Sequence, residues 1–247
     1  MIHSLEAVYR REVSAYFQTP LAYVFLAVFA CSAPAFAFHV GRFFDTNRAD
    51  LAPMFDYLPW LFVVLMPALA MRAWAEERDR GTLEFLMALP IPLWASTGGK
   101  FLAAWSMAAL ALALTFPMWL AVNYLGAPDN AAIATGYLGA WLMAGGYLAV
   151  GQALSATTSN QVVAFVLGTG AAFILTMAGH PLVLAALGEN APASVSEFVA
   201  GLSAFEHFDA FRNGVIGVPD LVYFLGLIVL ALTIAGVLVA ERRGGGR

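Results

Sequence analysis

Six long stretches of this sequence are almost free of charged residues, and this pattern constrains the fold more than any other feature. The hydrocarbon core of a bilayer is about 30 Å thick, so a helix needs about 20 mostly apolar residues to cross it. Leu, Ala, Val and Phe fill the stretches without the strict alternation of a membrane β-barrel strand. The sequence therefore predicts an all-α polytopic membrane protein, with one domain of six transmembrane helices over residues 21–240. The predicted spans are residues 21–41, 57–74, 101–122, 134–154, 161–184 and 221–240.

Composition excludes the main alternatives. Apolar residues make up 61% of the chain and charged residues only 11%, whereas about a quarter of a soluble domain is charged. The net charge of −4 and the lack of a basic run argue against a nucleic-acid partner. The single cysteine, Cys31, excludes a disulfide framework and a thiolate zinc site.

The basic residues predict the orientation, because Lys and Arg near the ends of spans stay in the cytoplasm. With the N-terminus inside, nine of the 12 basic residues fall in cytoplasmic segments and three fall outside. Both termini are therefore expected in the cytoplasm, with residues 241–247 as a short tail. The expected location is the bacterial inner membrane, and the first span is expected to be retained rather than cleaved.

Residues 4–18 show the spacing of an amphipathic helix on the cytoplasmic membrane surface. Glu6 and Arg10 lie four residues apart and predict an ion pair on its polar face. Pro20 is expected to end this helix. Two interpretations of residues 1–20 stay open: a plain interfacial anchor, or an elbow helix that also contacts a cytoplasmic partner. The elbow residues singled out are Arg10, Arg11, Glu12, Tyr16, Phe17 and Pro20.

The most informative loop joins the second and third spans, at residues 72–100. Its first part is dense in charge, with Glu76 and Arg80 again four residues apart, and predicts a helix that Gly81 ends. A second, short and apolar helix is predicted over residues 83–89. Because apolar side chains below the membrane should not stay in water, this helix needs a protein partner or the lipid headgroups. A simple interfacial helix is the alternative.

The longest predicted outer segment is residues 185–219. Ser194 and Glu197 form the pattern of a capping box, and Ser203 and Glu206 repeat it. The segment therefore predicts two short amphipathic outer helices.

Other kinds of site are not supported. Gly98-Gly99-Lys100 has the end of a phosphate-loop pattern, but Phe101 stands where that motif needs Ser or Thr. The four histidines are scattered, and the predicted span interiors hold no charged residue for a proton or ion pathway. We therefore expect no catalytic, cofactor-binding or metal-ligating residue in this chain. An interior without fixed charge suits a bulky or amphipathic cargo better than a bare ion.

The run Glu76-Glu77-Arg78-Asp79-Arg80-Gly81-Thr82-Leu83-Glu84-Phe85-Leu86, followed by Pro90, resembles the membrane subunit of type-2 ABC (ATP-binding cassette) exporters. In that family an E-E-x-x-x-G-T-x-E run forms the coupling helix that docks on a separate ATPase subunit. The resemblance covers the whole chain. Arg11-Glu12 with Tyr16-Phe17-Gln18-Thr19-Pro20-Leu21-Ala22-Tyr23 is similar to the gliding-motility-associated (GldF-like) branch, near the NosY-like copper-associated permeases.

The resemblance implies the ABC type-2 exporter fold and the function of a permease subunit that is not itself an enzyme. ATP and Mg would bind to the partner, an ABC ATPase present in two copies. A second copy of this chain or a related permease would complete the pore. The implied ATPase-coupling interface comprises Glu76, Glu77, Arg80, Gly81, Thr82, Leu83, Glu84, Phe85, Leu86 and Pro90.

Two alternatives stay open beside export. The chain could be a mechanotransmitting or scaffold subunit that acts on a periplasmic or envelope partner through its outer helices, without moving cargo. The weaker alternative is a copper-associated membrane protein or standalone membrane enzyme.

Overall fold

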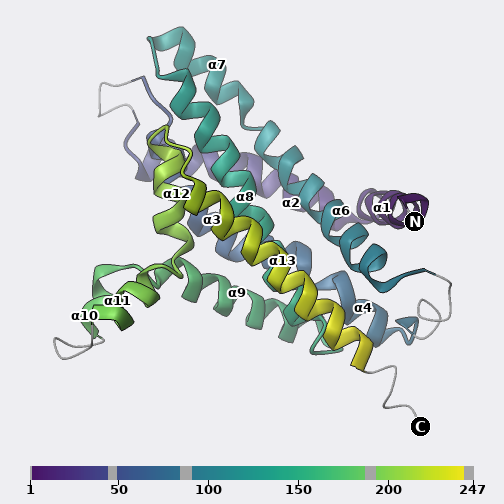
Figure 1. Ribbon diagram of the computed structural model, residues 1–247. Coiled ribbons are helices and arrows are strands. Elements are labelled where there is room, and N and C mark those ends of the chain that lie inside the picture. Colours follow the sequence, from purple (N-terminus) through teal and green to yellow (C-terminus); the bar gives the residue numbers. More distant parts are fainter. Residues whose placement is uncertain (1, 44–48, 84–90, 187–192, 242–247) are drawn as a thin grey trace.

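The computed structural model describes residues 2–43, 49–83, 91–186 and 193–241, and the regular elements in these ranges are helices (Figure 1). The N-terminal part consists of α1 (Ile2–Phe17), α2 (Pro20–Ala35) with its π-helical end η1 (Phe36–Val40), α3 (Ala52–Ala70) and α4 (Arg72–Asp79). The middle part consists of α6 (Leu93–Ala113), α7 (Phe116–Leu125), α8 (Asn130–Ser155) and α9 (Gln161–Met177). The C-terminal part consists of α10 (Pro181–Ala186), α11 (Ala193–Ala200), α12 (Ala204–Arg212) and α13 (Val218–Glu241).

Five helical segments of the described chain are long and apolar enough to cross a bilayer. They are Pro20–Val40, Ala52–Asp79, Leu93–Leu125, Asn130–Ser155 and Val218–Glu241. The predicted all-helical, multi-pass architecture agrees with these segments. The remaining apolar helix, α9, has 17 residues and ends well before residue 184, so the sixth crossing stays a prediction.

Helix α8 lies at the centre of the bundle, between α3, α6, α9, α12 and α13 (Figure 1). Glycines along α8 allow this close packing, as small residues do at helix contacts in membranes. A Cβ at Gly151 would lie 2.8 Å from the Cβ of Ala70 on α3, and one at Gly145 would lie 2.8 Å from Nε1 of Trp105 on α6. The small residues of α8 therefore serve helix packing.

The third predicted span differs from the structure in where its helix begins. Helix α6 starts at Leu93, directly after Pro92, and so includes residues that we assigned to the loop. It breaks at Thr115, whose hydroxyl bonds to the Leu112 carbonyl (2.7 Å) and the Tyr137 hydroxyl (2.8 Å), before α7 continues the rod. Lys100 therefore lies inside a helix rather than in a loop.

The two short helices expected between residues 185 and 219 are present as α11 and α12. The Ser203 side chain caps α12 by accepting from the Glu206 amide, and the helix ends before Gly214, whose φ is +83°. His207 on α12 contacts Asp220 on α13 through Nδ1 at 2.6 Å. These contacts join α12 to the start of α13.

Candidate functional site

The charged helix predicted from residue 76 onward is confirmed as α4, which we call the stalk. Glu76 lies between two guanidinium groups, 2.6 Å from Arg72 and 2.7 Å from Arg80, at i−4 and i+4. The stalk ends at Gly81, whose φ of +66° lies in the left-handed region that favours glycine. The stalk continues the direction of α3 with a break only at Met71.

A buried hydroxyl fastens the break between α3 and the stalk to α8. Ser155 Oγ accepts from the amides of Trp74 (3.1 Å) and Ala75 (3.0 Å) and donates to the Met71 carbonyl (2.8 Å). Trp74 and Ser155 are fully buried, and Trp74 packs with Val239 of α13 in a small separate core. One face of the stalk is therefore held on the bundle by packing and hydrogen bonds.

Helix α1 packs firmly on α6. A Cβ at Gly99 would lie 2.7 Å from Val8 Cγ1, so only glycine lets Val8 reach the α6 backbone. The Tyr9 hydroxyl lies 3.1 Å from Ser106 Oγ. The predicted ion pair of Glu6 with Arg10 is present at 2.7 Å.

The expected role of Pro20 needs a correction. Helix α1 ends at Phe17, where the Thr19 amide and hydroxyl both bond to the Tyr16 carbonyl, and Pro20 is the first residue of α2. Proline suits this place because the first turn of a helix has no use for its missing amide hydrogen.

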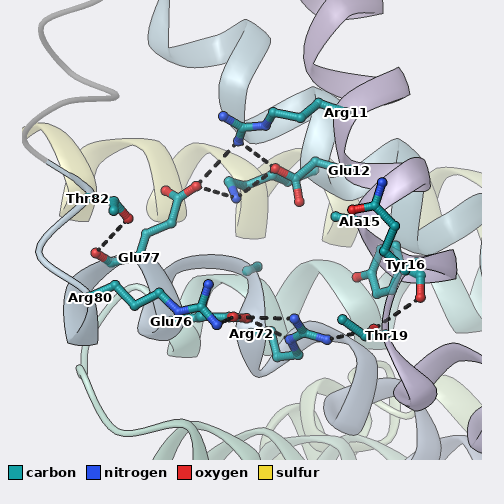
Figure 2. A pocket seen from close by; sticks show the side chains of 13 residues that line it. Arg11, Glu12, Ala15, Tyr16, Thr19, Arg72, Glu76, Glu77, Arg80 and Thr82 are labelled. Carbon is teal, nitrogen blue, oxygen red and sulfur yellow. Dashed lines mark hydrogen bonds and ion pairs between the residues drawn. The ribbon is translucent and has the colours of Figure 1, made fainter.

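Four charged side chains from three helices meet between α1, the stalk and α6, and we call them the four-charge cluster (Figure 2). Lys100 Nζ lies 2.8 Å from Glu77 and 3.1 Å from Glu12. Arg11 bridges the same two carboxylates, at 2.6 Å from Glu12 and 3.4 Å from Glu77. The Lys100 side chain is only 5% exposed, and its ammonium lies 5.3 Å from the centre of the Trp74 ring.

The cluster borders a cavity of about 460 Å³ that opens between α1 and the stalk (Figure 2). Its wall holds four basic and three acidic side chains, so its charges are nearly balanced. Arg72 also donates to Thr19 Oγ1 (3.2 Å), and the Tyr16 hydroxyl donates to the Leu69 carbonyl (3.3 Å). The cavity is thus closed at the end near Met71 and is spanned by charged groups farther along the stalk.

The structure brings together most of the described residues that the sequence singled out. Around the cavity lie Arg11, Glu12, Tyr16, Glu76, Glu77, Arg80 and Thr82. Arg10 and Phe17 are not among the residues that line it, and Leu83 packs against the small core of Trp74. Glu84, Phe85, Leu86 and Pro90 lie outside the described residues. The coupling role of all these residues stays a prediction.

Sequence reasoning missed Lys100, Arg72 and Thr19, which complete this site. The sequence predicts a span that begins at residue 101, eight residues after the start of α6 at Leu93, and this leaves Lys100 in the predicted loop. The signal was available: two glycines precede the lysine, and glycine pairs in a helix mark a close helix contact.

The cluster predicts a pH dependence of stability. Burial raises the pKa of the Glu12 carboxyl, but Lys100 and Arg11 outweigh burial, so the pKa lies below its ordinary range. A carboxyl with a lowered pKa stabilises the fold above its unfolded value of about 4.3, and this stabilisation is lost as the pH falls through the folded value. We expect the melting temperature in detergent to fall more steeply below about pH 4.3 for the wild type than for Glu12→Gln.

Glu6→Gln is the control for this titration, because Glu6 pairs with Arg10 of its own helix on the exposed face of α1. Its profile should follow that of the wild type. Parallel profiles for Glu12→Gln and the wild type across pH 3 to 7 would contradict the prediction.

Comparison of the chain with known protein families gives a match to one of them. Residues 15–241 match the family described as "ABC-2 family transporter protein", and this range covers the stalk, every candidate span and the residues lining the cavity apart from Arg11 and Glu12. A search of curated proteins found no match. Members of this family are membrane subunits that work with an ABC ATPase and are generally not catalytic themselves. The chain, with its long apolar helices and its charged stalk, therefore belongs to the ABC-2 transporter family and is a multi-pass membrane protein.

Proposed function

We propose that this chain is the permease subunit of an ABC exporter, driven by ATP hydrolysis in a separate subunit. One observation carries the proposal: the stalk extends a candidate span, Ala52–Asp79, as a charged helix that is held by α8 on one side and by α1 and α6 on the other. A force applied beyond Gly81 would reach the bundle through these contacts. Family membership supplies the source of that force, an ABC ATPase.

The proposed orientation places α1, the stalk and both termini in the cytoplasm of a bacterial cell, with α11 and α12 on the outer side of the inner membrane. In this arrangement α9 supplies the sixth crossing of a single domain over residues 21–240. The distribution of basic residues supports it, since the positive charges of α1 and the stalk lie at one end of the bundle.

The proposed assembly holds two ATPase subunits, which bind ATP and Mg, and a second copy of this chain or a related permease. The coupling segment, residues 76–90, would present Leu83, Phe85 and Leu86 to a groove of the ATPase. Charged residues of the same segment would flank these apolar side chains. The large apolar surfaces of α2 and α13, each mostly exposed in the single chain, would be covered by lipid or by the second permease.

The proposed cargo is bulky or amphipathic. Ionisable side chains in the candidate spans lie toward helix ends, as Asp56, Lys100 and Asp220 do. Residues farther along α8 and α9 offer hydroxyls instead, such as the Tyr147 and Thr176 pair at 2.6 Å. Such an interior gives a bare ion no charged site at depth.

Leu86→Asp is expected to abolish the stimulation and copurification of the ATPase, because a charge in an apolar docking segment opposes burial. Membrane insertion should be unchanged, since residue 86 lies outside the candidate spans. The measurement is copurification of the partner ATPase subunit from solubilised membranes, with Leu86→Met as the control. Normal copurification of the Leu86→Asp protein would contradict the proposal.

A mechanical role on an envelope partner is the second candidate. The close contacts that α12 and α13 make at the proposed outer end of the bundle favour it. Phe211 of α12 packs directly on Gly139 of α8, and the Tyr223 hydroxyl donates to the Leu202 carbonyl (2.6 Å). Movements of the bundle would thus reach α12. ATP-dependent movement of labelled lipid in vesicles would support export, and a working complex without it would support the mechanical role.

The copper-associated alternative stays the weaker proposal. Within the described ranges, no group of three or more His, Cys, Asp or Glu side chains lies close enough to hold a metal ion.

A further inference from the structure

Helices α1 and α6 behave as one packed unit at their contact. Val8 is 3% exposed and fills the space above Gly99, while Leu5 lies beside Gly98 at 3.3 Å from a Cβ built there. Such close apposition of backbone and buried side chain leaves little room for sliding. The N-terminal part of α6, around Gly98 and Gly99, is therefore expected to move together with α1.

The stalk meets this α1–α6 unit in two different ways along its length. Near Met71 the link is formed by the Tyr16 hydroxyl on the Leu69 carbonyl and by Arg72 on Thr19. Farther along, the cavity lies between the helices, and the ion pairs of the four-charge cluster cross it. The charges of this cluster thus join the far end of the stalk to the unit.

Within the cluster, Lys100 is the buried cation. Lysine is rarely this buried unless it is paired, and here its ammonium has two carboxylates. Arg11 reaches the same carboxylates, but its side chain is 50% exposed, so solvent weakens its attraction. Without Lys100, Glu12 and Glu77 would face each other as two largely buried like charges.

We propose that Lys100 is a positioning residue that ties the far end of the stalk to the α1–α6 unit, so that stalk and unit move as one body during transport. The inference rests on the proposed function for its purpose, since only a driven stalk needs such a tie. Its geometric part concerns the isolated chain and can be tested without any ATPase.

The first experiment measures the distance between the stalk and α1 in the purified full chain. Spin labels are placed at Ala7→Cys and Asp79→Cys, both exposed and outside the cluster, in a Cys31→Ala background. We expect one narrow distance peak with Lys100 present. Lys100→Met should lose that peak and give a broad distribution, because the two carboxylates repel each other once the half-exposed Arg11 is the cation left between them. Lys100→Arg should restore the peak by returning the charge.

Arg80→Met is the matched control. Arg80 also lines the cavity, but its ion pair is with Glu76 on the same helix and its side chain is 68% exposed. It should keep the narrow peak. A narrow peak in Lys100→Met, or an equal broadening in Arg80→Met, would overturn the proposal, and the circular dichroism spectrum and melting curve of each variant report whether it is folded.

The second experiment uses the same labels in the complex with the ATPase. The tie predicts that ATP leaves the α1–stalk distance unchanged in the wild type and changes it in Lys100→Met. A change in the wild type would overturn the tie. Failure of any ATPase to bind would count against the proposed function alone, because the first experiment does not involve the ATPase.

Discussion

Ser155→Ala is expected to lower the stability of the bundle by about 2–4 kcal/mol, because each buried amide that loses its partner costs about 1–3 kcal/mol. The Ser155 hydroxyl serves the amides of Trp74 and Ala75 together, and both lie where solvent cannot replace it. For a chain of this size the loss corresponds to a fall in melting temperature of roughly 5–15 °C. Thermal unfolding in detergent, followed by intrinsic tryptophan fluorescence, measures it.

Thr233→Ala is the control for this substitution. The Thr233 hydroxyl is exposed and bonds to the Val229 carbonyl of its own helix. Its removal should change the free energy of unfolding by no more than about 0.5 kcal/mol, so the melting temperature should change little. Equal effects of the two substitutions would show that Ser155 does not hold the stalk, and the proposed path from stalk to α8 would then fail.

Gly139→Ala is the second large expected effect. A Cβ at this position would lie 2.5 Å from the Cβ of Phe211 and 2.7 Å from its Cγ, and Phe211 is fully buried. Because the obstructing atoms are next to the backbone of α12, a side-chain rotation cannot clear them. Overpacking of this kind costs about 1–3 kcal/mol, and α12 should move away from α8.

Gly170→Ala separates this clash from the general effect of replacing glycine in a helix. Among the described residues, apart from its chain neighbours and the nearby backbone of α9 itself, nothing lies within 4 Å of a Cβ built at Gly170. Alanine is the better helix former by about 1 kcal/mol, so this variant should melt at the same temperature or higher. A stabilising Gly139→Ala would contradict the close packing of α12 on α8.

Local features of the fold were predictable from the sequence because they depend on neighbours along the chain. The pairs Glu6 with Arg10 and Glu76 with Arg80 follow from i,i+4 spacing alone. The end of the stalk at Gly81 follows from the conformational freedom of glycine. Long apolar stretches likewise predicted membrane-crossing helices, although the ends of α6 and α9 differ from those expected.

Contacts between distant segments were not predictable, since no local pattern records them. Ser155 has its partners 80 to 84 positions away, and nothing near it in the sequence distinguishes it from a turn serine. Gly98 and Gly99 could be rejected as a phosphate loop, but their actual use, to admit Leu5 and Val8, depends on where α1 packs.

By itself, the sequence determined that this chain forms apolar helices in a membrane, with a charged stalk and an amphipathic N-terminal helix, because hydropathy and helical spacing are properties of short segments. Only the tertiary structure decided that the charges of the stalk are shared with α1 and α6 and that Lys100 is buried among them. The physical reason is that a charge needs a partner wherever water is excluded, and packing decides where that is.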